Sequence, residues 1–434
     1  MYLSNQSVIF IYGGTGEQNY TAEKLAVYRV NMKILLVLRE FNRHRYDALA
    51  DQAWNTALNM TADGQVQCVI AAGRNPGEMA MEVIGNVQIR RFGSEPEPWW
   101  ARCWKKHTGE VGTERLPGLE IFLDKNQFDL VHIMCTGRLC VQAAEIARKR
   151  NIPYVISCRS EDFRLYDAVS NTLNSSALSP FQTHLRSYGD GLMHAARIFC
   201  SDHNLRRHLA ERLGDRKLIH WPCGVNVEFY SKPSAVDFRQ FYQLPKSRNI
   251  ILSVGRICCN RNQKMLLDIL AVLRNKNYNC HLVVIGPAVD AGYLKGFQAQ
   301  ITALKLDGFV TYIPGLPPGD EFFKAAYQAA SLVLLPGRYA VGGSAVLEAW
   351  STGVPVVVSP VGGGGELVID GENGRVASPG DFQQWINCCC ELLDERNRSQ
   401  LEKMRSAGMN VARNSNWDKR LSELMEIYKN CIKK

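Results

Sequence analysis

Residues 332–376 read LVLLPGRYAVGGSAVLEAWSTGVPVVVSPVGGGGELVIDGENGRV, and this stretch carries the clearest prediction of the fold. Its first four residues form an apolar run stopped by Pro336-Gly337, which is typical of a buried parallel strand. Gly342-Gly343 then permits a sharp turn, and Ser344 is the expected N-cap of a helix over residues 345–351. Alternating strands and helices of this kind indicate a doubly wound α/β sheet with parallel strands.

A second buried strand is expected at residues 354–359, and a four-glycine loop follows it at 362–365. Two glycine-rich turns therefore end neighbouring strands, and one of them leads into a helix N-terminus. The free N–H groups and the helix dipole favour a phosphate there, and glycine lets it approach the backbone. We expect a donor-binding anion site formed by Gly343, Ser344, Ala345, Gly362 and Gly363.

Glu348 lies four residues after Ser344, hence on the same helix face and one turn deeper. A carboxylate does not suit the phosphate itself, but it suits a hydroxyl donor beside it, such as a ribose diol. The alternative is an ordinary helix of an α/β core flanked by loop glycines. A lone glycine pair would favour that alternative, whereas the whole segment favours a binding site.

The segment resembles the donor-site signature of the retaining family-4 glycosyltransferases of GT-B fold. The matching residues, in order, are Leu347-Glu348-Ala349, Gly353-Val354-Pro355-Val356-Val357, Gly362-Gly363, Glu366 and Asn373-Gly374. Members of that family carry another glutamate eight positions before the one at 348. In this chain Ala340 stands there, and Gly342 replaces the usual aromatic residue. The resemblance implies two Rossmann-like domains facing a cleft, with the donor mainly on the second.

Two arginines follow the first predicted strand of the second domain. That strand covers residues 249–255 and ends at Gly255-Arg256, and Arg261 comes five residues after Arg256. Ligands of open α/β sheets sit beyond the carboxyl ends of strands. The pattern resembles the family's G-R-x4-K motif, with Arg261 in the place of the lysine. The resemblance implies that both arginines act in catalysis, holding the diphosphate and stabilising its growing charge. An ordinary surface pair is the alternative.

The first domain resembles the family less closely. Arg159 follows a predicted strand at 153–157 and stands where the family commonly has a histidine beside the reacting sugar. Arginine neutralises negative charge but cannot act as a general base, so Arg159 is a candidate for reading an acidic sugar or acceptor. After the strand at 32–38 the family shows a glycine pair, whereas this chain has the basic segment 39–45.

The chain of 434 residues is long enough for two domains of ordinary size. We predict an acceptor domain and a nucleotide-sugar domain, both Rossmann-like, and a final helix that crosses back to the first. The predicted boundaries are 1–31 for an N-terminal extension, 32–230 for the first domain, 231–248 for a linker, 249–415 for the second domain and 416–434 for the final helix.

The composition, 46% hydrophobic and 21% charged, is that of a globular protein. The net charge of +9 suits an anionic donor or an acidic membrane surface and does not indicate nucleic acid. The 14 cysteines show no zinc-module spacing. With no secretory leader, they favour a reducing cytoplasm. No apolar run approaches the ~18 residues that a membrane span needs.

The segment EPEPWWARCWKK, residues 95–106, combines tryptophans with basic side chains. Trp99, Trp100 and Trp104 could form an interfacial helix resting on lipid headgroups at the inner face of the membrane. The alternative is a proline-punctuated loop that enters a helix whose tryptophans pack on the domain.

The predicted activity is retaining, metal-independent transfer of a sugar from a nucleotide-diphosphate sugar to an acceptor hydroxyl. No D-x-D metal motif is present, and no cofactor besides the donor is expected. On family grounds the acceptor is a glycan or a lipid-linked intermediate of glycan, polysaccharide or glycolipid assembly.

Arg159 and Ala340 keep two alternatives open. One is a nucleotide-sugar-binding protein without turnover, and the other, less favoured, is a nucleotide-sugar epimerase, whose chemistry requires carboxylates around the sugar carbon.

Overall fold

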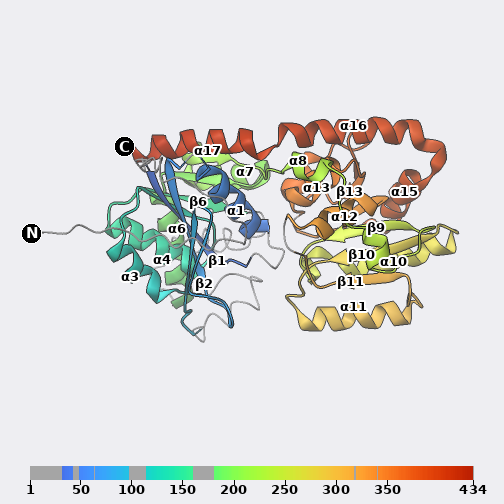
Figure 1. The fold of residues 1–434 in the computed structure, drawn as a ribbon, viewed down its shortest axis with the longest axis horizontal. Helices are drawn as coiled ribbons and strands as arrows, with labels where there is room; N and C mark the ends of the chain where they lie inside the picture. The colour runs from blue at the N-terminus through green and yellow to red at the C-terminus, as the bar shows by residue number, and fades with distance from the viewer. Residues whose placement is uncertain are drawn as a thin grey trace, which may run out of the picture.

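The computed structural model describes residues 32–42, 48–62, 64–96, 114–159, 180–316, 319–339 and 341–433. Within them two α/β domains lie side by side, with the N-terminal half of the chain in one and most of the C-terminal half in the other (Figure 1). The predictions that concern residues 1–31, the three tryptophans of 99–104 and Ala340 lie outside the described residues.

The first domain is built on an eight-stranded sheet in the order β3-β4-β2-β1-β5-β6-β7-β8. Only the edge pair β3 and β4 is antiparallel among the pairings of this sheet. The strands are β1 (Met32–Glu40), β2 (Val66–Gly73), β3 (Met81–Ile84), β4 (Val87–Phe92), β5 (Leu130–Ile133), β6 (Tyr154–Cys158), β7 (Arg197–Cys200) and β8 (Leu218–His220). The helices around them are α1 (Ala48–Met60), α3 (Pro117–Lys125), α4 (Arg138–Lys149), α6 (Pro180–His194) and α7 (His203–Leu213).

The second domain is built on a six-stranded sheet in the order β11-β10-β9-β12-β13-β14, and its strand pairs are parallel. Its strands are β9 (Asn249–Val254), β10 (Cys280–Ile285), β11 (Val310–Ile313), β12 (Leu332–Leu335), β13 (Val356–Val358) and β14 (Arg375–Val376). Its helices are α10 (Gln263–Asn275), α11 (Ala291–Ala303), α12 (Glu321–Ala329), α13 (Gly343–Ser351), α14 (Gly362–Leu367), α15 (Phe382–Leu393) and α16 (Arg398–Asn414).

The predicted fold class, two doubly wound parallel-sheet domains, is confirmed. Continuous apolar runs form the central strands because helices cover both faces of each sheet and leave no solvated side. In β1 the residues Ile34–Leu38 are at most 1% exposed, and in β10 every residue is buried. Sequence patterns did not predict the hairpin of β3 and β4, nor α3, α6, α11 and α12.

The segment predicted as a linker, residues 231–248, is packed onto the second domain. It contains the end of α8 (Val227–Ser231) and the short α9 (Phe238–Phe241). Phe238 and Leu244 are buried in the core that also holds β9 and α13. The polar composition of this segment concealed these two apolar anchors, which stabilise a fixed path for the chain between the domains.

The last helix, α17 (Trp417–Ile432), runs along the first domain (Figure 1). Its buried face, Trp417, Leu421, Leu424 and Tyr428, joins the core formed by β1, β2 and α1. The spacing of these residues places them on one side of a helix. The Tyr428 hydroxyl also lies 2.5 Å from Nδ1 of the buried His132. The C-terminal segment therefore packs on both domains, through α16 on the second and α17 on the first.

No helix in the part of the chain that the structure describes has both the length and the apolar character needed to cross a membrane.

Candidate functional site

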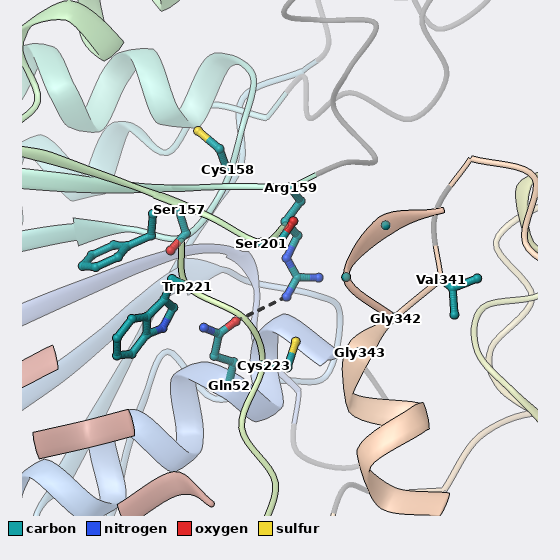
Figure 2. Close-up of a pocket in the computed structure, with 13 residues that line it drawn as sticks. Gln52, Ser157, Cys158, Arg159, Ser201, Trp221, Cys223, Val341, Gly342 and Gly343 are labelled. Carbon is teal, nitrogen blue, oxygen red and sulfur yellow. Dashed lines mark hydrogen bonds between the residues drawn. The ribbon is translucent and has the colours of Figure 1, made fainter. Parts of the chain in front are cut away.

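A pocket lies between the two domains, where the carboxyl ends of both sheets point toward each other (Figure 2). The first domain contributes α1 and the ends of β6, β7 and β8, and the second contributes the starts of α13 and α14. Ligands of parallel α/β sheets bind at this edge because glycine-rich loops and helix N-termini meet there. Among the polar and glycine residues that line this pocket are Gln52, Arg159, Ser201, Cys223, Gly342, Gly343, Gly362 and Gly363.

Arg159 supplies the only charged side chain among the described residues that line this pocket. It follows β6 directly and extends between Gln52 and the start of α13 (Figure 2). Its Nη2 donates to Oε1 of Gln52 at 3.5 Å, which is the long end of the hydrogen-bond range. The guanidinium therefore places a permanent positive charge in the pocket.

The helix α13 begins two residues earlier than the sequence predicted, and the expected N-cap role of Ser344 is wrong. Gly342 is the N-cap, with φ −70° and ψ 128°, and Gly343 is the first helical residue. Ser344 already has helical backbone geometry, whereas an N-cap residue must be extended. No side chain caps the first turn. Its N–H groups are left to other partners, and the one of Ser344 is bonded to the half-buried Cys223 thiol.

The four-glycine segment predicted as a loop is the start of helix α14. Its glycines are required by close packing. A Cβ on Gly364 would lie 2.6 Å from Val341, and one on Gly365 would lie 2.7 Å from the carbonyl oxygen of Ser359. A Cβ on Gly363 would lie 3.0 Å from the carbonyl oxygen of Ser201 in the other domain. Tertiary packing thus overrides the low helix propensity of glycine.

Glu348 lies behind the pocket wall, with 4% of its surface exposed. The hydroxyl of Tyr327 donates to its Oε2 at 2.7 Å. Burial raises the pKa of Glu348 to about 8; the Tyr327 hydrogen bond opposes the rise, and the charge of Asp51 in the first domain adds to it. Its role toward a ribose stays a prediction. The structure adds that Tyr327 holds the carboxyl group and that burial favours its protonated form.

Replacing Glu348 with glutamine is expected to change how stability depends on pH. The pKa is higher in the folded chain, about 8 against 4.5, so folding takes up a proton between these values and the wild type loses stability as pH rises through them. Relative to Glu348→Gln, this loss should approach ~1.4 kcal/mol per pH unit. Urea unfolding at pH 5, 6, 7 and 8 measures it. Glu372→Gln, at an exposed site, is the control; a wild-type curve parallel to that of Glu348→Gln would contradict the expectation.

Gly255, Arg256 and Arg261 follow β9, the strand at which the sheet order of the second domain reverses direction. They do not line the pocket described above. The backbone oxygen of Arg256 accepts a hydrogen bond from Gln263 at 2.8 Å, which fixes the turn. Burial raises the pKa of the Cys258 thiol, and the positive charges of Arg261 and Arg256 oppose the rise, so both charges lie within electrostatic range of this thiol.

A further arginine, Arg39, reaches this region from the end of β1 in the first domain. Glu114 holds it with two hydrogen bonds, of 2.9 and 3.1 Å. The pKa of Arg39 is raised. Burial and the nearby positive charge of Arg256 both lower this pKa, but the Glu114 carboxylate raises it by more. Arg39 and Arg256 therefore bring two cations to facing ends of the two sheets, as an anionic ligand requires.

Several functional candidates escaped the sequence reasoning. Gln52, Cys223 and Tyr327 carry no local pattern that marks a site, because their contacts join segments far apart in the chain. Arg39 could have been found from the sequence, because it begins the basic segment that replaces the glycine pair of the resembled family after the first strand. Of the predicted residues, Arg159, Gly343, Gly362 and Gly363 are brought together in the pocket, whereas Ser344, Ala345 and Glu348 lie along α13 behind it.

Two family models match the chain. The family described as Glycosyl transferases group 1 matches residues 236–411, and the one described as Glycosyl transferase 4-like domain matches residues 48–223. Each match falls on one of the two sheets, so both halves of the fold are covered.

Curated relatives carry related names. The D-inositol 3-phosphate glycosyltransferase of Corynebacterium diphtheriae is 26% identical over 211 residues, 47% of this chain and 48% of that protein. The phosphatidyl-myo-inositol mannosyltransferase of Mycobacterium leprae is 28% identical over 265 residues, 60% of this chain and 65% of that protein. The chain spans about half the length of the first of these relatives.

A solved structure of Anabaena HepE in complex with UDP and glucose superposes with a TM-score of 0.70. The match covers 92% of this chain and all of that one, at 18% sequence identity. At this identity the similarity is one of fold.

Proposed function

The chain belongs to the group 1 glycosyltransferases of GT-B fold, and from this premise we propose that it transfers a sugar from a nucleotide-diphosphate sugar to an acceptor hydroxyl, with retention at the anomeric carbon. The observation that carries the proposal is the pocket between facing strand ends, with arginine on one side and the uncapped start of α13 on the other. Such a site suits an anionic donor whose reacting sugar lies between the domains.

Arg256, Arg261 and the first turn of α13 hold the donor diphosphate in this proposal. Two of its supports are the position of Arg256 at the switch point of the sheet and the effect of both arginine charges on the same thiol, that of Cys258. Permanent positive charges and backbone N–H groups stabilise the negative charge that grows on the diphosphate as the sugar leaves. A further support is that the structural neighbour HepE was solved with UDP and glucose.

Glu348 binds the donor ribose in this proposal. Ionised, its carboxylate accepts hydrogen bonds from a diol, and Tyr327 keeps it oriented. Because burial favours the protonated form of Glu348, binding through the ionised form becomes easier as pH rises toward about 8.

The transfer step needs neither an enzyme nucleophile nor a metal. The acceptor oxygen forms its bond to the anomeric carbon on the face from which the diphosphate oxygen departs, and the acceptor proton passes to that phosphate oxygen. Arg159 contributes charge beside the reaction and suits an acidic group on the sugar or the acceptor. No cofactor besides the donor enters the proposal.

The acceptor is proposed to be a glycan or a lipid-linked intermediate handled in the cytoplasm or at the inner membrane face. The relatives named for inositol phosphate and phosphatidylinositol support this class. Contact with the membrane through the tryptophans of 99–104 stays a prediction from the sequence alone.

Thermal unfolding of the chain against UDP, GDP, ADP, TDP and the corresponding nucleotide sugars tests the donor site. One nucleotide at ~100 times its dissociation constant should add ~2.7 kcal/mol to the free energy of unfolding and raise the midpoint by a few degrees. Transfer to added acceptors, or release of free sugar, then identifies turnover. Binding without any product would favour the nucleotide-sugar-binding protein without turnover, and a changed epimer would favour the epimerase. A flat response to every nucleotide would contradict the donor site.

The transfer rate with the identified donor is expected to persist in EDTA, since the leaving diphosphate is stabilised by arginine and helix N–H groups rather than by an ion. The measurement compares initial rates with and without the chelator, and the matched control repeats it with the chelator saturated by calcium. A complete loss of rate that added magnesium or manganese restores would contradict the metal-independent mechanism.

A further inference from the structure

Three side chains with metal-ligating atoms meet where the two domains touch. His203 is the first residue of α7, His220 is the last residue of β8, and Glu366 lies on α14 of the second domain. One nitrogen from each imidazole and one carboxylate oxygen all lie within 4.8 Å of one another. The two imidazole rings are stacked, with centroids 3.7 Å apart and an angle of 27° between the planes. Neither histidine figured in the sequence analysis.

Glu366 already joins the two domains in this cluster. Its carboxylate accepts hydrogen bonds from the backbone N–H groups of His203 at 2.8 Å and of Asn204 at 3.1 Å. This contact holds the carboxylate beside the His203 ring, and each oxygen keeps a further lone pair. Backbone contacts therefore fix the Glu366 carboxylate, whereas the exposed His203 ring beside it is free to turn out of the stack.

We propose that His203, His220 and Glu366 bind one divalent transition-metal ion of the Zn2+ class, which ties α14 of the second domain to α7 and β8 of the first. Two imidazoles and one carboxylate are a ligand set that zinc accepts, with bonds of roughly 2.0–2.2 Å and the remaining position open to water. Tetrahedral bonds of this length put ligand atoms ~3.4 Å apart. Side-chain rotation of the exposed His203 closes the remaining gap.

The charges around the cluster are compatible with a cation. Asp202 adds a negative charge, while Arg206 and Arg420 are the nearby positive groups that act on His220. Arg206 is paired with Asp215 at 2.7 Å, and Arg420 with Glu423 at 3.7 Å.

The ion would act on the pocket through its walls. Ser201 lies two residues before His203, Gly363 lies three residues before Glu366, and both line the pocket. Bound metal would therefore hold the start of α14 against the end of β7. The proposed ion takes no part in the bonds that form and break during transfer. Its binding therefore does not decide whether transfer persists in EDTA.

The test is titration of the full chain with Co2+ and Zn2+, followed by calorimetry and by the absorption of the cobalt form. One ion per chain is expected to bind, and the affinity should fall at least tenfold in His203→Ala and in His220→Ala. His208→Ala, on the same helix but outside the cluster, is the matched control and should bind as the wild type does. The cobalt spectrum should show no thiolate charge transfer, because no cysteine is a ligand.

His203 is exposed, so His203→Ala is expected to fold and can be tested even if His220→Ala does not fold. Zn2+ should raise the unfolding midpoint of the wild type and of His208→Ala, but not of His203→Ala. The proposal would be overturned if the wild type and His203→Ala bind the ion with equal affinity, or if the wild type binds no more tightly than both histidine variants. A thiolate band in the cobalt form would also overturn it.

Discussion

Replacing Arg256 with alanine is expected to lower the rate of sugar transfer by about 10²- to 10³-fold, as loss of one preorganised charge stabiliser does in other enzymes. Arg256 directly follows β9, which lies between β10 and β12 at the point where the sheet order reverses. The crevice at such a point opens beyond the carboxyl ends of the strands, where α13 also begins. Arg261 remains in the variant, but the site loses one of the two positive charges proposed to hold the diphosphate as it becomes more negative.

Steady-state kcat and KM, with direct binding of the nucleoside diphosphate, measure this effect. Arg396→Ala is the matched control, because Arg396 belongs to the same domain, is 89% exposed at its side chain and pairs only with the nearby Asp394 in the described interactions. The control should leave both constants unchanged, and thermal unfolding should show that both variants are folded. Wild-type affinity for the diphosphate together with a wild-type rate in Arg256→Ala would remove this residue from the site.

Replacing Gly365 with valine is expected to lower the free energy of unfolding by about 3 kcal/mol, which is the upper part of the range for overpacked positions. The new Cβ would lie 2.7 Å from the carbonyl oxygen of Ser359 and 2.8 Å from the backbone of Pro360. Neither contact is the end of a flexible side chain, so the backbone of α14 or of the preceding turn must move. Because Gly362 and Gly363 line the pocket from the same helix, donor affinity should fall as well.

Gly380→Val is the control for this change, since a Cβ on Gly380 meets nothing within 4 Å and the residue is exposed. Urea unfolding of the two variants and the wild type measures the difference in midpoint at constant slope. Equal destabilisation by both substitutions would show that the loss comes from valine in the chain rather than from packing at position 365.

Much of the fold could be predicted from the sequence because the residue pattern within many of the strands and helices indicates their type. The uninterrupted apolar runs inside β1, β9 and β12 predict central parallel strands covered on both faces. The regular spacing of buried residues in α17 likewise predicts a helix with one packed face. The hairpin of β3 and β4 was missed because β3 is short and alternates only between exposed and half-buried residues, although Gly85-Asn86 between the strands is a typical two-residue hairpin turn.

The candidate site was only partly predictable. Arg159, Arg256 and the glycines of α13 and α14 stand at strand ends, a position that local pattern indicates. Whether the four glycines form a loop or a helix was not indicated locally, because glycine permits both and only the proximity of Val341 and Ser359 selects the helix.

The sequence by itself determined the two parallel sheets, the strand ends that carry arginine and glycine, and the family to which these patterns belong. Only the tertiary structure decided which of those residues share one pocket, that Tyr327 holds Glu348, and that His203 and His220 meet Glu366 across the domain boundary. The physical reason is that strands and helices follow from the order of neighbouring residues, whereas these contacts join segments far apart in the chain. Their geometry depends on how α17 and the packed segment 231–248 set the two domains against each other.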